Sequence, residues 1–214
     1  RTDSPGDPRG AHGIGAFLVP TDTPGFLRGE REETMGLRAA AVLRIRLREV
    51  RLPADALLGE ADRGFACAME ALDLGRLGIA AQATGIARAA FEYARDYAAV
   101  REQFGRKIRD FEGIQFKLAD MATRIEAARA LLARAATSPS TGAAAMAKLF
   151  ASETAMAVTT QAVQVFGGYG YMRDYPVEKL MRDAKATEIY EGTNEILRVV
   201  IARGLYRPEQ PDRL

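Results

Sequence analysis

The segment IYEGTNEI, residues 189–196, contains the carboxylate that most invites a chemical interpretation. Glu191 stands between a tyrosine and a glycine, and Thr193 follows two positions later. A carboxylate in such a setting is either a solvated turn residue or a general base held at a site. The residue type alone does not separate these two interpretations, so the other motifs and the elements that position them have to do so.

Three further motifs each have an ordinary and a functional interpretation. FGGYG (166–170) follows a helical pattern and not a strand, so it is not a dinucleotide-binding fingerprint. Its glycines either end a helix in the left-handed conformation or let a ligand touch bare backbone. Arg101, in REQFG, closes a helical stretch, where an arginine ordinarily complements the helix dipole. Asp73 and Arg76, in LDLGR, are spaced for an ion pair on one helical face, which is usually exposed and weak.

Composition excludes several classes of protein. The chain has 214 residues, 48% of them apolar, and a formal net charge of +2, which is typical of a globular protein and not of a disordered tail or a nucleic-acid-binding arm. Its one cysteine, Cys67, permits no internal disulfide and no cysteine metal cluster, and we expect no metal site. Its one histidine, His12, lies among glycines, where we expect an ordinary loop histidine.

The sequence carries no visible targeting or membrane signal. No signal peptide is recognised, and no apolar run reaches the roughly 18 residues that a membrane span needs. We therefore expect no membrane span and a cytoplasmic location of the bacterial type. The chain opens on RTDSPGDPRG, which has the character of the middle of a protein, so a mitochondrial matrix location stays open.

The first sixty residues have the pattern of strands. Residues 14–20 form a short apolar run closed by a proline, and the following TDTPGF has the composition of a turn. In residues 43–48 leucine and isoleucine alternate with arginine, which predicts a strand with one buried and one solvated face. Three or four such strands are too few for a self-sufficient sheet, so we expect something else to complete it.

The rest of the chain has a helical pattern. Residues 64–102 are rich in Ala, Leu, Met and Arg, and residues 111–136 carry an apolar stripe at spacings of three and four. A third helix is predicted over 143–166, a short one after Pro176, and a last one after Thr193, whose type suits an N-cap. Long helices joined by short loops predict an antiparallel bundle.

Taken in order, these motifs resemble those of the acyl-CoA dehydrogenase family, and most closely its short-chain, butyryl-CoA-type members. The matching segments are GAFLVP, TPG, MGLRA, VRLPADALLGE, LDLGRLGIAAQATGIA, REQFG, IQFKLADMA, AAMAKLFASE, QVFGGYGY, PVEKLMRDAK and EIYEGTNEI. The resemblance covers about residues 13–207 and implies that this chain is the C-terminal portion of a subunit. It implies a partial middle β-domain at 1–60 and a C-terminal antiparallel four-helix bundle at 61–214, so the expected fold class is mostly α with a partial β region.

The resemblance also implies a reaction. Members of the family oxidise an acyl-CoA thioester to the trans-2-enoyl-CoA: a carboxylate removes the α-proton while a hydride leaves the β-carbon for FAD. Glu191 matches that base. Some members carry the base at the position of Gly75 instead, and the glycine found here indicates the loop position. The residues that match the substrate site are Asp73, Leu74, Gly75, Arg76 and Gly192.

The cofactor implied by the resemblance is FAD, shared across a dimer interface. Arg101 matches an arginine that pairs with the FAD pyrophosphate, and QVFGG matches a segment that meets the FAD of a neighbouring subunit. A family glutamine that contacts FAD is Glu112 here, and an acceptor-only carboxylate would repel a pyrophosphate. The implied cofactor-binding residues are Arg101, Phe104, Glu112, Gln164, Val165, Phe166, Gly167, Gly168, Thr193, Asn194 and Glu195.

Partners follow from the same resemblance. We expect an acyl-CoA substrate, a homodimer or homotetramer, the electron-transfer flavoprotein as electron acceptor, and no nucleic acid. Two other interpretations stay open at the level of sequence. One is a non-catalytic bundle that assembles with a partner supplying the missing domains, and the other is an oxidase-like relative that passes electrons to oxygen.

Overall fold

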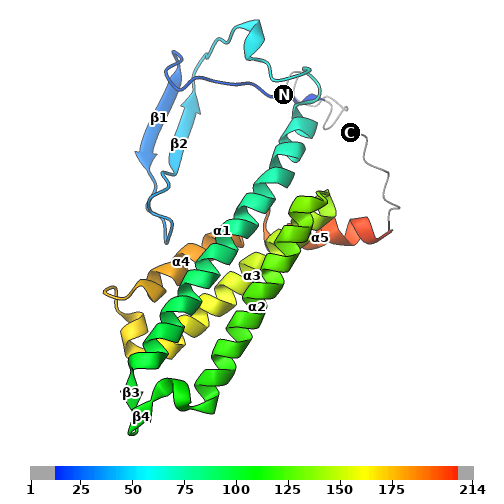
Figure 1. Cartoon of the computed structure of the whole chain (residues 1–214). Helices are drawn as coiled ribbons and strands as arrows, with labels where there is room; N and C mark the ends of the chain where they lie inside the picture. The colour runs from blue at the N-terminus through cyan, green and yellow to red at the C-terminus, as the bar shows by residue number, and fades with distance from the viewer. Residues whose placement is uncertain (1–12, 207–214) are drawn as a thin grey trace. The chain divides into compact units, whose positions relative to one another are not determined.

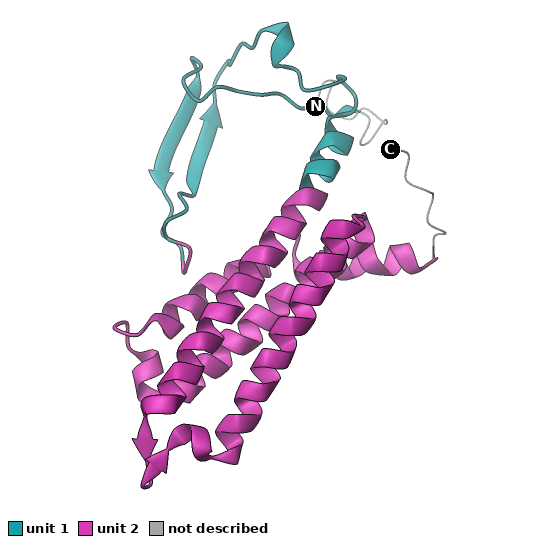
Figure 2. Ribbon diagram, viewed as in Figure 1, with its two compact units in different colours: residues 1–34, 38–72 teal, residues 35–37, 73–214 magenta. Residues whose placement is uncertain are grey.

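The computed structural model describes residues 13–206, so His12 lies outside the described residues. The described part is mostly helical, which confirms the predicted fold class. It divides into two compact units (Figure 2). The first comprises the described residues up to Thr34 together with Arg38–Leu72, and the second comprises Met35–Leu37 and the described residues from Asp73 onward.

The first unit contains a two-stranded antiparallel sheet. Its strands are β1 (Phe26–Arg31) and β2 (Leu43–Leu47) (Figure 1). The predicted burial of one face is wrong within this unit, because Leu43, Ile45 and Leu47 are 38%, 54% and 60% exposed. Two strands offer too little surface to bury either face of a sheet, so the apolar face of β2 stays uncovered.

The other strand expected in this unit is not formed. The apolar run 14–20 makes only an isolated antiparallel bridge, between Phe17 and Leu57. Strand β1 begins instead at Phe26, in a segment whose composition indicates a turn, and the register sets Phe26 opposite Leu47. A strand needs a partner along its length to form a ladder of hydrogen bonds, and the run 14–20 has one at a single position only.

The second unit is a bundle of helices whose predicted bounds are confirmed to within two residues (Figure 1). The helices defined within residues 13–206 are α1 (Gly64–Val100), α2 (Glu112–Thr137), α3 (Thr141–Phe166), α4 (Pro176–Thr187) and α5 (Asn194–Tyr206). α1 contributes to this unit from Asp73 onward. None of these helices combines the length and the apolar character that crossing a membrane requires.

Alanines form much of the core of the bundle. On α1 six alanines at spacings of three and four are fully buried, which makes one apolar stripe along the helix. They are Ala80, Ala83, Ala87, Ala90, Ala94 and Ala98. The predicted stripe of α2 is confirmed, since Met121, Ile125 and Ala128 belong to the same core. Helix α3 is buried on most sides because α2, α4 and α5 all contact it, and close packing of this kind holds the helix ends in fixed positions.

The connection from α1 to α2 contains more regular structure than the predicted loop. A short hairpin joins β3 (Glu102–Gln103) to β4 (Arg106–Lys107), and a 3-10 turn, η3 (Ile108–Asp110), follows. At the hairpin tip Phe104 and Gly105 have φ of 55° and 79°, the two left-handed residues that a tight hairpin turn requires. A phenylalanine is an uncommon choice for that position, which is why the sequence pattern did not predict the hairpin.

Candidate active site

The loop between α4 and α5 has an unusual backbone. Glu191 has φ of 55° and Gly192 has φ of 96°, so two successive residues occupy the left-handed region. A non-glycine residue in that region costs roughly 1–2 kcal/mol. Such a conformation persists only where the surrounding structure holds it. The contacts that hold this loop come from α1 and α3.

The carboxylate of Glu191 lies against the bare backbone of α1. A Cβ built on Gly75 would lie 2.4 Å from Oε2 and 2.9 Å from Cδ of Glu191, which is closer than such atoms pack. Oε2 is buried and has no hydrogen-bond partner among the described residues. Because buried carboxylate oxygens normally accept hydrogen bonds, this oxygen is exceptional, and its lone pairs are free to take a proton. The geometry therefore favours a base over a solvated turn residue.

Arg76 ties this loop to α1. It is only 6% exposed, its Nη1 donates to Oδ1 of Asp73 at 2.5 Å, and its Nε donates to the backbone oxygen of Glu191 at 3.5 Å. The hydroxyl of Thr141, at the start of α3, donates to the other oxygen of Asp73 at 2.5 Å. The ordinary interpretation of Asp73 and Arg76 as an exposed ion pair is therefore wrong. Leu74 is 71% exposed beside them and offers an apolar surface.

A second set of contacts holds the loop from α3. Lys148 is fully buried, and its Nζ donates to the backbone oxygen of Gly192 at 2.7 Å and to Oδ1 of Asn194 at 3.1 Å. The hydroxyl of Ser152, one turn further along α3, donates to the same Oδ1 at 3.0 Å. Burial lowers the pKa of Lys148 to about 8. The motifs of the sequence do not single out Lys148, although a lone lysine within the run AAAMAKLFAS is an available signal.

The N-terminus of α5 completes this region. The hydroxyl of Thr193 accepts from the backbone N–H of Ile196 at 3.4 Å, which is a weak version of the predicted N-cap. The carboxyl of Glu195 is exposed, and hydrogen bonds from the backbone N–H of Glu195 itself and from the hydroxyl of Thr193 lower its pKa. Thr193, Asn194 and Glu195 thus form a polar edge next to Glu191, as their sequence order requires.

A cavity of about 460 Å³ lies at the C-terminal end of α1. Arg101 and residues 165–168, all predicted to bind the cofactor, line it together. The Arg101 guanidinium lies 5.4 Å from the ring centre of Tyr169, and the ring of Tyr97 stacks on that of Phe166 at 4.1 Å. Gly167 ends α3 with φ of 62°, so the ordinary interpretation of this glycine, a helix C-cap, is confirmed. A cation, exposed glycine backbone and aromatic rings suit a phosphate group joined to a ring system.

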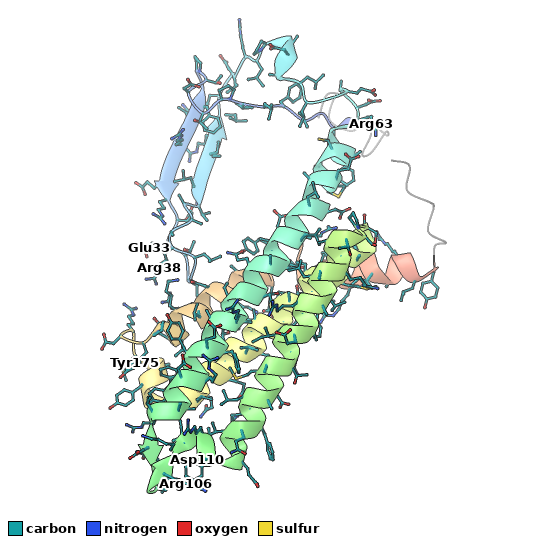
Figure 3. All side chains as sticks on the ribbon, viewed as in Figure 1. Glu33, Arg38, Arg63, Arg106, Asp110 and Tyr175 are labelled. Atoms are coloured by element: carbon teal, nitrogen blue, oxygen red, sulfur yellow. The ribbon has the colours of Figure 1, made fainter. Side chains whose placement is uncertain are left out.

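Six residues predicted to bind the cofactor do not line this cavity: Gln164, Glu112 and Phe104, and also Thr193, Asn194 and Glu195. Gln164 and Glu112 are exposed, and Glu112 is the first residue of α2, where a carboxylate complements the helix dipole. Phe104 is 93% exposed at the tip of the β3–β4 hairpin. Arg106 and Asp110, labelled in Figure 3, mark this end of the bundle. The ring of Phe104 meets that of Phe111 edge-on at 6.2 Å and is otherwise open within the described chain.

The two groups of predicted cofactor residues lie far apart. Gly75 faces Glu191, and Val100, the last residue of α1, directly precedes Arg101. The 25 steps from Gly75 to Val100 along α1 correspond to about 37 Å at 1.5 Å per residue. Arg101 and residues 165–168 are therefore brought together at the C-terminal end of α1, while Glu191, with Thr193, Asn194 and Glu195 following it in the chain, lies at Gly75, far from that end. A single copy of this chain does not present all of them to one small ligand.

Comparison with protein families matches residues 62–206 to the family model described as acyl-CoA dehydrogenase, C-terminal domain. Among curated proteins, an acyl-CoA dehydrogenase of Bacillus subtilis is 52% identical over 202 residues, which are 92% of this chain and 53% of the relative. The chain therefore spans about half the length of the curated relatives it matches.

Comparison with solved structures gives the same relationship. Butyryl-CoA dehydrogenase from Megasphaera elsdenii superposes with a TM-score of 0.93 and 49% identity, over 96% of this chain and 54% of that one. A chain in a structure concerned with the electron-transferring flavoprotein of Acidaminococcus fermentans and flavin-based electron bifurcation superposes with a TM-score of 0.92 and 51% identity, over 94% of this chain and 54% of that one. About half of the superposed residues are identical in each case.

Proposed function

The chain belongs to the acyl-CoA dehydrogenase family, and from this we propose that it is the C-terminal part of an enzyme that oxidises an acyl-CoA thioester to the trans-2-enoyl-CoA. The observation that carries the proposal is the Glu191 carboxylate, whose buried Oε2 lacks a donor among the described residues and faces Gly75. The similarity to a butyryl-CoA dehydrogenase supports a short acyl chain as substrate.

Glu191 is the base that removes the α-proton of the substrate. Its Oε2 can accept a proton without giving up an existing hydrogen bond, because it has none within the described chain. Two side chains hold the backbone of the loop at this point: Arg76 of α1 donates to the carbonyl of Glu191, and Lys148 of α3 donates to the carbonyl of Gly192. A base held in this way is ready for proton transfer before the substrate arrives, which is how a positioned base contributes to rate.

Residues of α1 form the border of the substrate site. Gly75 leaves the space that the Glu191 carboxylate occupies, and a side chain there would compete for it. Asp73 and Arg76 are locked to each other and to the start of α3, so they give that border a fixed position. Leu74 offers exposed apolar surface for the substrate, and Gly192 presents loop backbone without a side chain.

The residues predicted to bind the cofactor fall into two groups, Arg101 with residues 165–168 and residues 193–195, and their chemistry fits FAD. Arg101 beside the exposed backbone of Gly167 and Gly168 suits a pyrophosphate, and the neighbouring rings suit an aromatic group. Bound FAD would supply the acceptor for the hydride that leaves the substrate β-carbon. Because the two groups lie about 37 Å apart along α1, one copy supplies Arg101 and residues 165–168 to each cofactor, and a second copy supplies Thr193, Asn194 and Glu195.

The same arrangement defines the partners. A site completed by two copies requires at least a homodimer, and a homotetramer would contain two such pairs. The exposed Phe104 lies at the end of the bundle where the second copy's cofactor would be bound. The electron-transfer flavoprotein is the proposed acceptor of the electrons, supported by the similarity to a chain in a structure concerned with such a flavoprotein.

The decisive experiment uses the complete subunit loaded with FAD. Butyryl-CoA is mixed with it under anaerobic conditions while the flavin absorbance is followed. Stoichiometric bleaching is the expected result. A flavin that stays oxidised would support a non-catalytic bundle instead, and rapid oxygen uptake in air without another acceptor would support an oxidase-like relative.

A further inference from the structure

Lys148 is a buried cation that the proposed reaction does not consume. It is fully buried, and its hydrogen bonds within the described chain go to two neutral oxygens, on Gly192 and Asn194. Among the described residues no carboxylate forms an ion pair with it. Burying a cation without a charged partner is costly, and an apolar residue of similar size would fill the same space without that cost. A lysine at this position therefore requires a reason other than stability.

Lys148 makes a short hydrogen bond to the loop that carries Glu191. Its bond of 2.7 Å to the carbonyl of Gly192 has the length of a strong charge-assisted bond, whereas the bond from Arg76 to the carbonyl of Glu191, at 3.5 Å, is at the limit for a hydrogen bond. Glu191 and Gly192 are the two residues in the left-handed conformation. Of the two side chains that hold this turn, Lys148 thus makes the stronger contact.

Asn194 extends the same anchor to the start of α5. Its side-chain oxygen accepts from both Lys148 and Ser152, and its backbone N–H donates to the carbonyl of Glu188 at 3.1 Å. The loop is thereby closed on itself between residues 188 and 194 and fastened to α3 at two points. The position of the Glu191 carboxylate against Gly75 depends on that closure, because the side chain projects from within the closed loop.

We propose that Lys148 is a positioning residue that holds the left-handed turn at Glu191 and Gly192 and so aims the Glu191 carboxylate at the substrate. This inference rests on the proposed function of Glu191. The charged groups that face the ammonium are Glu188, Arg76, Glu195 and Glu191. The attraction between Lys148 and the Glu191 carboxyl acts in addition to the hydrogen bonds.

The test compares three variants of the complete, FAD-loaded enzyme. Lys148→Met removes the charge and all donors but keeps the length of the side chain, and Lys148→Arg restores a charged donor. Lys117→Met is the matched control, because Lys117 also joins two helices through its Nζ, by a 2.6 Å bond to Gln161 between α2 and α3. Hydrogen exchange of the peptide covering residues 188–194 is measured without substrate, and kcat and KM are measured with butyryl-CoA.

For Lys148→Met we expect faster exchange in the loop by about tenfold or more, as the loss of a buried charge-assisted bond requires. We expect kcat to fall by about 10²-fold with KM little changed, since a misplacement of about 1 Å has that effect. Lys148→Arg should recover part of both losses, and Lys117→Met should change neither. A merely structural role would instead speed exchange throughout the bundle, with no recovery in Lys148→Arg.

Unchanged loop exchange and unchanged kcat in Lys148→Met would overturn the proposal, and so would faster exchange spread over the whole bundle. If Lys148→Met does not fold, Lys148→Gln takes its place with the same two measurements and the same outcomes. If the parent enzyme fails to bleach with butyryl-CoA, the proposed function fails, while the exchange measurement still decides whether Lys148 anchors the loop.

Discussion

Replacing Gly75 by alanine tests the geometry of the proposed base. The new Cβ would lie 2.4 Å from Oε2 of Glu191, whereas ordinary contact begins near 3.4 Å, so the carboxylate has to withdraw by about 1 Å. The atoms it meets are the far end of a flexible side chain, so the helix backbone stays in place and the carboxylate moves. The substitution therefore displaces the base and leaves the fold intact.

The expected effects on rate and on stability have opposite signs. A misplacement of about 1 Å lowers the rate by about 10²-fold, which is about 2.7 kcal/mol of barrier. Alanine is favoured over glycine inside a helix by roughly 0.8–1 kcal/mol. We thus expect Gly75→Ala to unfold at the parent temperature or slightly above it, and to reduce its flavin far more slowly than the parent.

Gly78→Ala is the matched control. Gly78 lies one turn further along α1, and a Cβ built on it meets nothing within 4 Å. It should gain the same helical stability and keep the parent rate. Both variants are made in the complete, FAD-loaded enzyme and compared by anaerobic stopped-flow mixing with butyryl-CoA and by thermal unfolding. If Gly75→Ala bleaches its flavin at the parent rate, the carboxylate is not held where the reaction occurs and the assignment of Glu191 fails.

Three further predictions concern the rest of the site. Glu191→Gln should retain FAD and acyl-CoA but lose about 10²–10⁴-fold or more in the rate of flavin reduction, because the nearly isosteric amide cannot take the α-proton; a parent rate would refute the assignment. Arg101→Ala should weaken FAD retention by about 10- to 100-fold, measured by equilibrium dialysis, and the exposed Arg109→Ala should not; equal retention in both would exclude Arg101 from the cofactor site. Burial lowers the pKa of Lys148 from 10.5 to about 8, so between these two pH values the unfolded state binds more protons and the parent should gain stability as the pH rises. Denaturant unfolding of parent and Lys148→Met over that window should show a steeper rise in the parent, and parallel curves would contradict the cause given.

The helices could be predicted from local pattern because each one carries its own signals. The α2 stripe has regular spacings, Pro176 occupies the first turn of α4, and Gly167 ends α3. The strands could not be predicted as well. Alternation in residues 43–48 predicts a buried face, but burial depends on what covers the sheet, and the two strands of the first unit do not cover each other.

The positions of the site residues were predictable only in part. The sequence order alone makes Glu191, Gly192 and Asn194 neighbours, and the motif resemblance selects them. It does not show that Gly75 faces the carboxylate of Glu191, since these residues are far apart in the chain and meet only through the packing of α1 against the rest of the bundle. All the site assignments stay predictions, and those of Glu112, Phe104 and Gln164 have the least support, because these residues are exposed and lie outside the cavity that Arg101 lines.

The burial of Lys148 and its hydrogen bond to the loop could not be predicted from the sequence pattern, although the residue itself is easily found there. A lysine in a helix is ordinarily solvated, so its type argues for a surface position, and only the burial of α3 on most sides reverses that expectation. Burial in turn requires acceptors, and the carbonyl of Gly192 can serve because the left-handed turn leaves it without a partner in regular structure. The buried Lys148 and the left-handed turn at Glu191 and Gly192 are each unfavourable alone. Because Lys148 donates to the turn, each stabilises the other, and together they fix the carboxylate of Glu191 against α1.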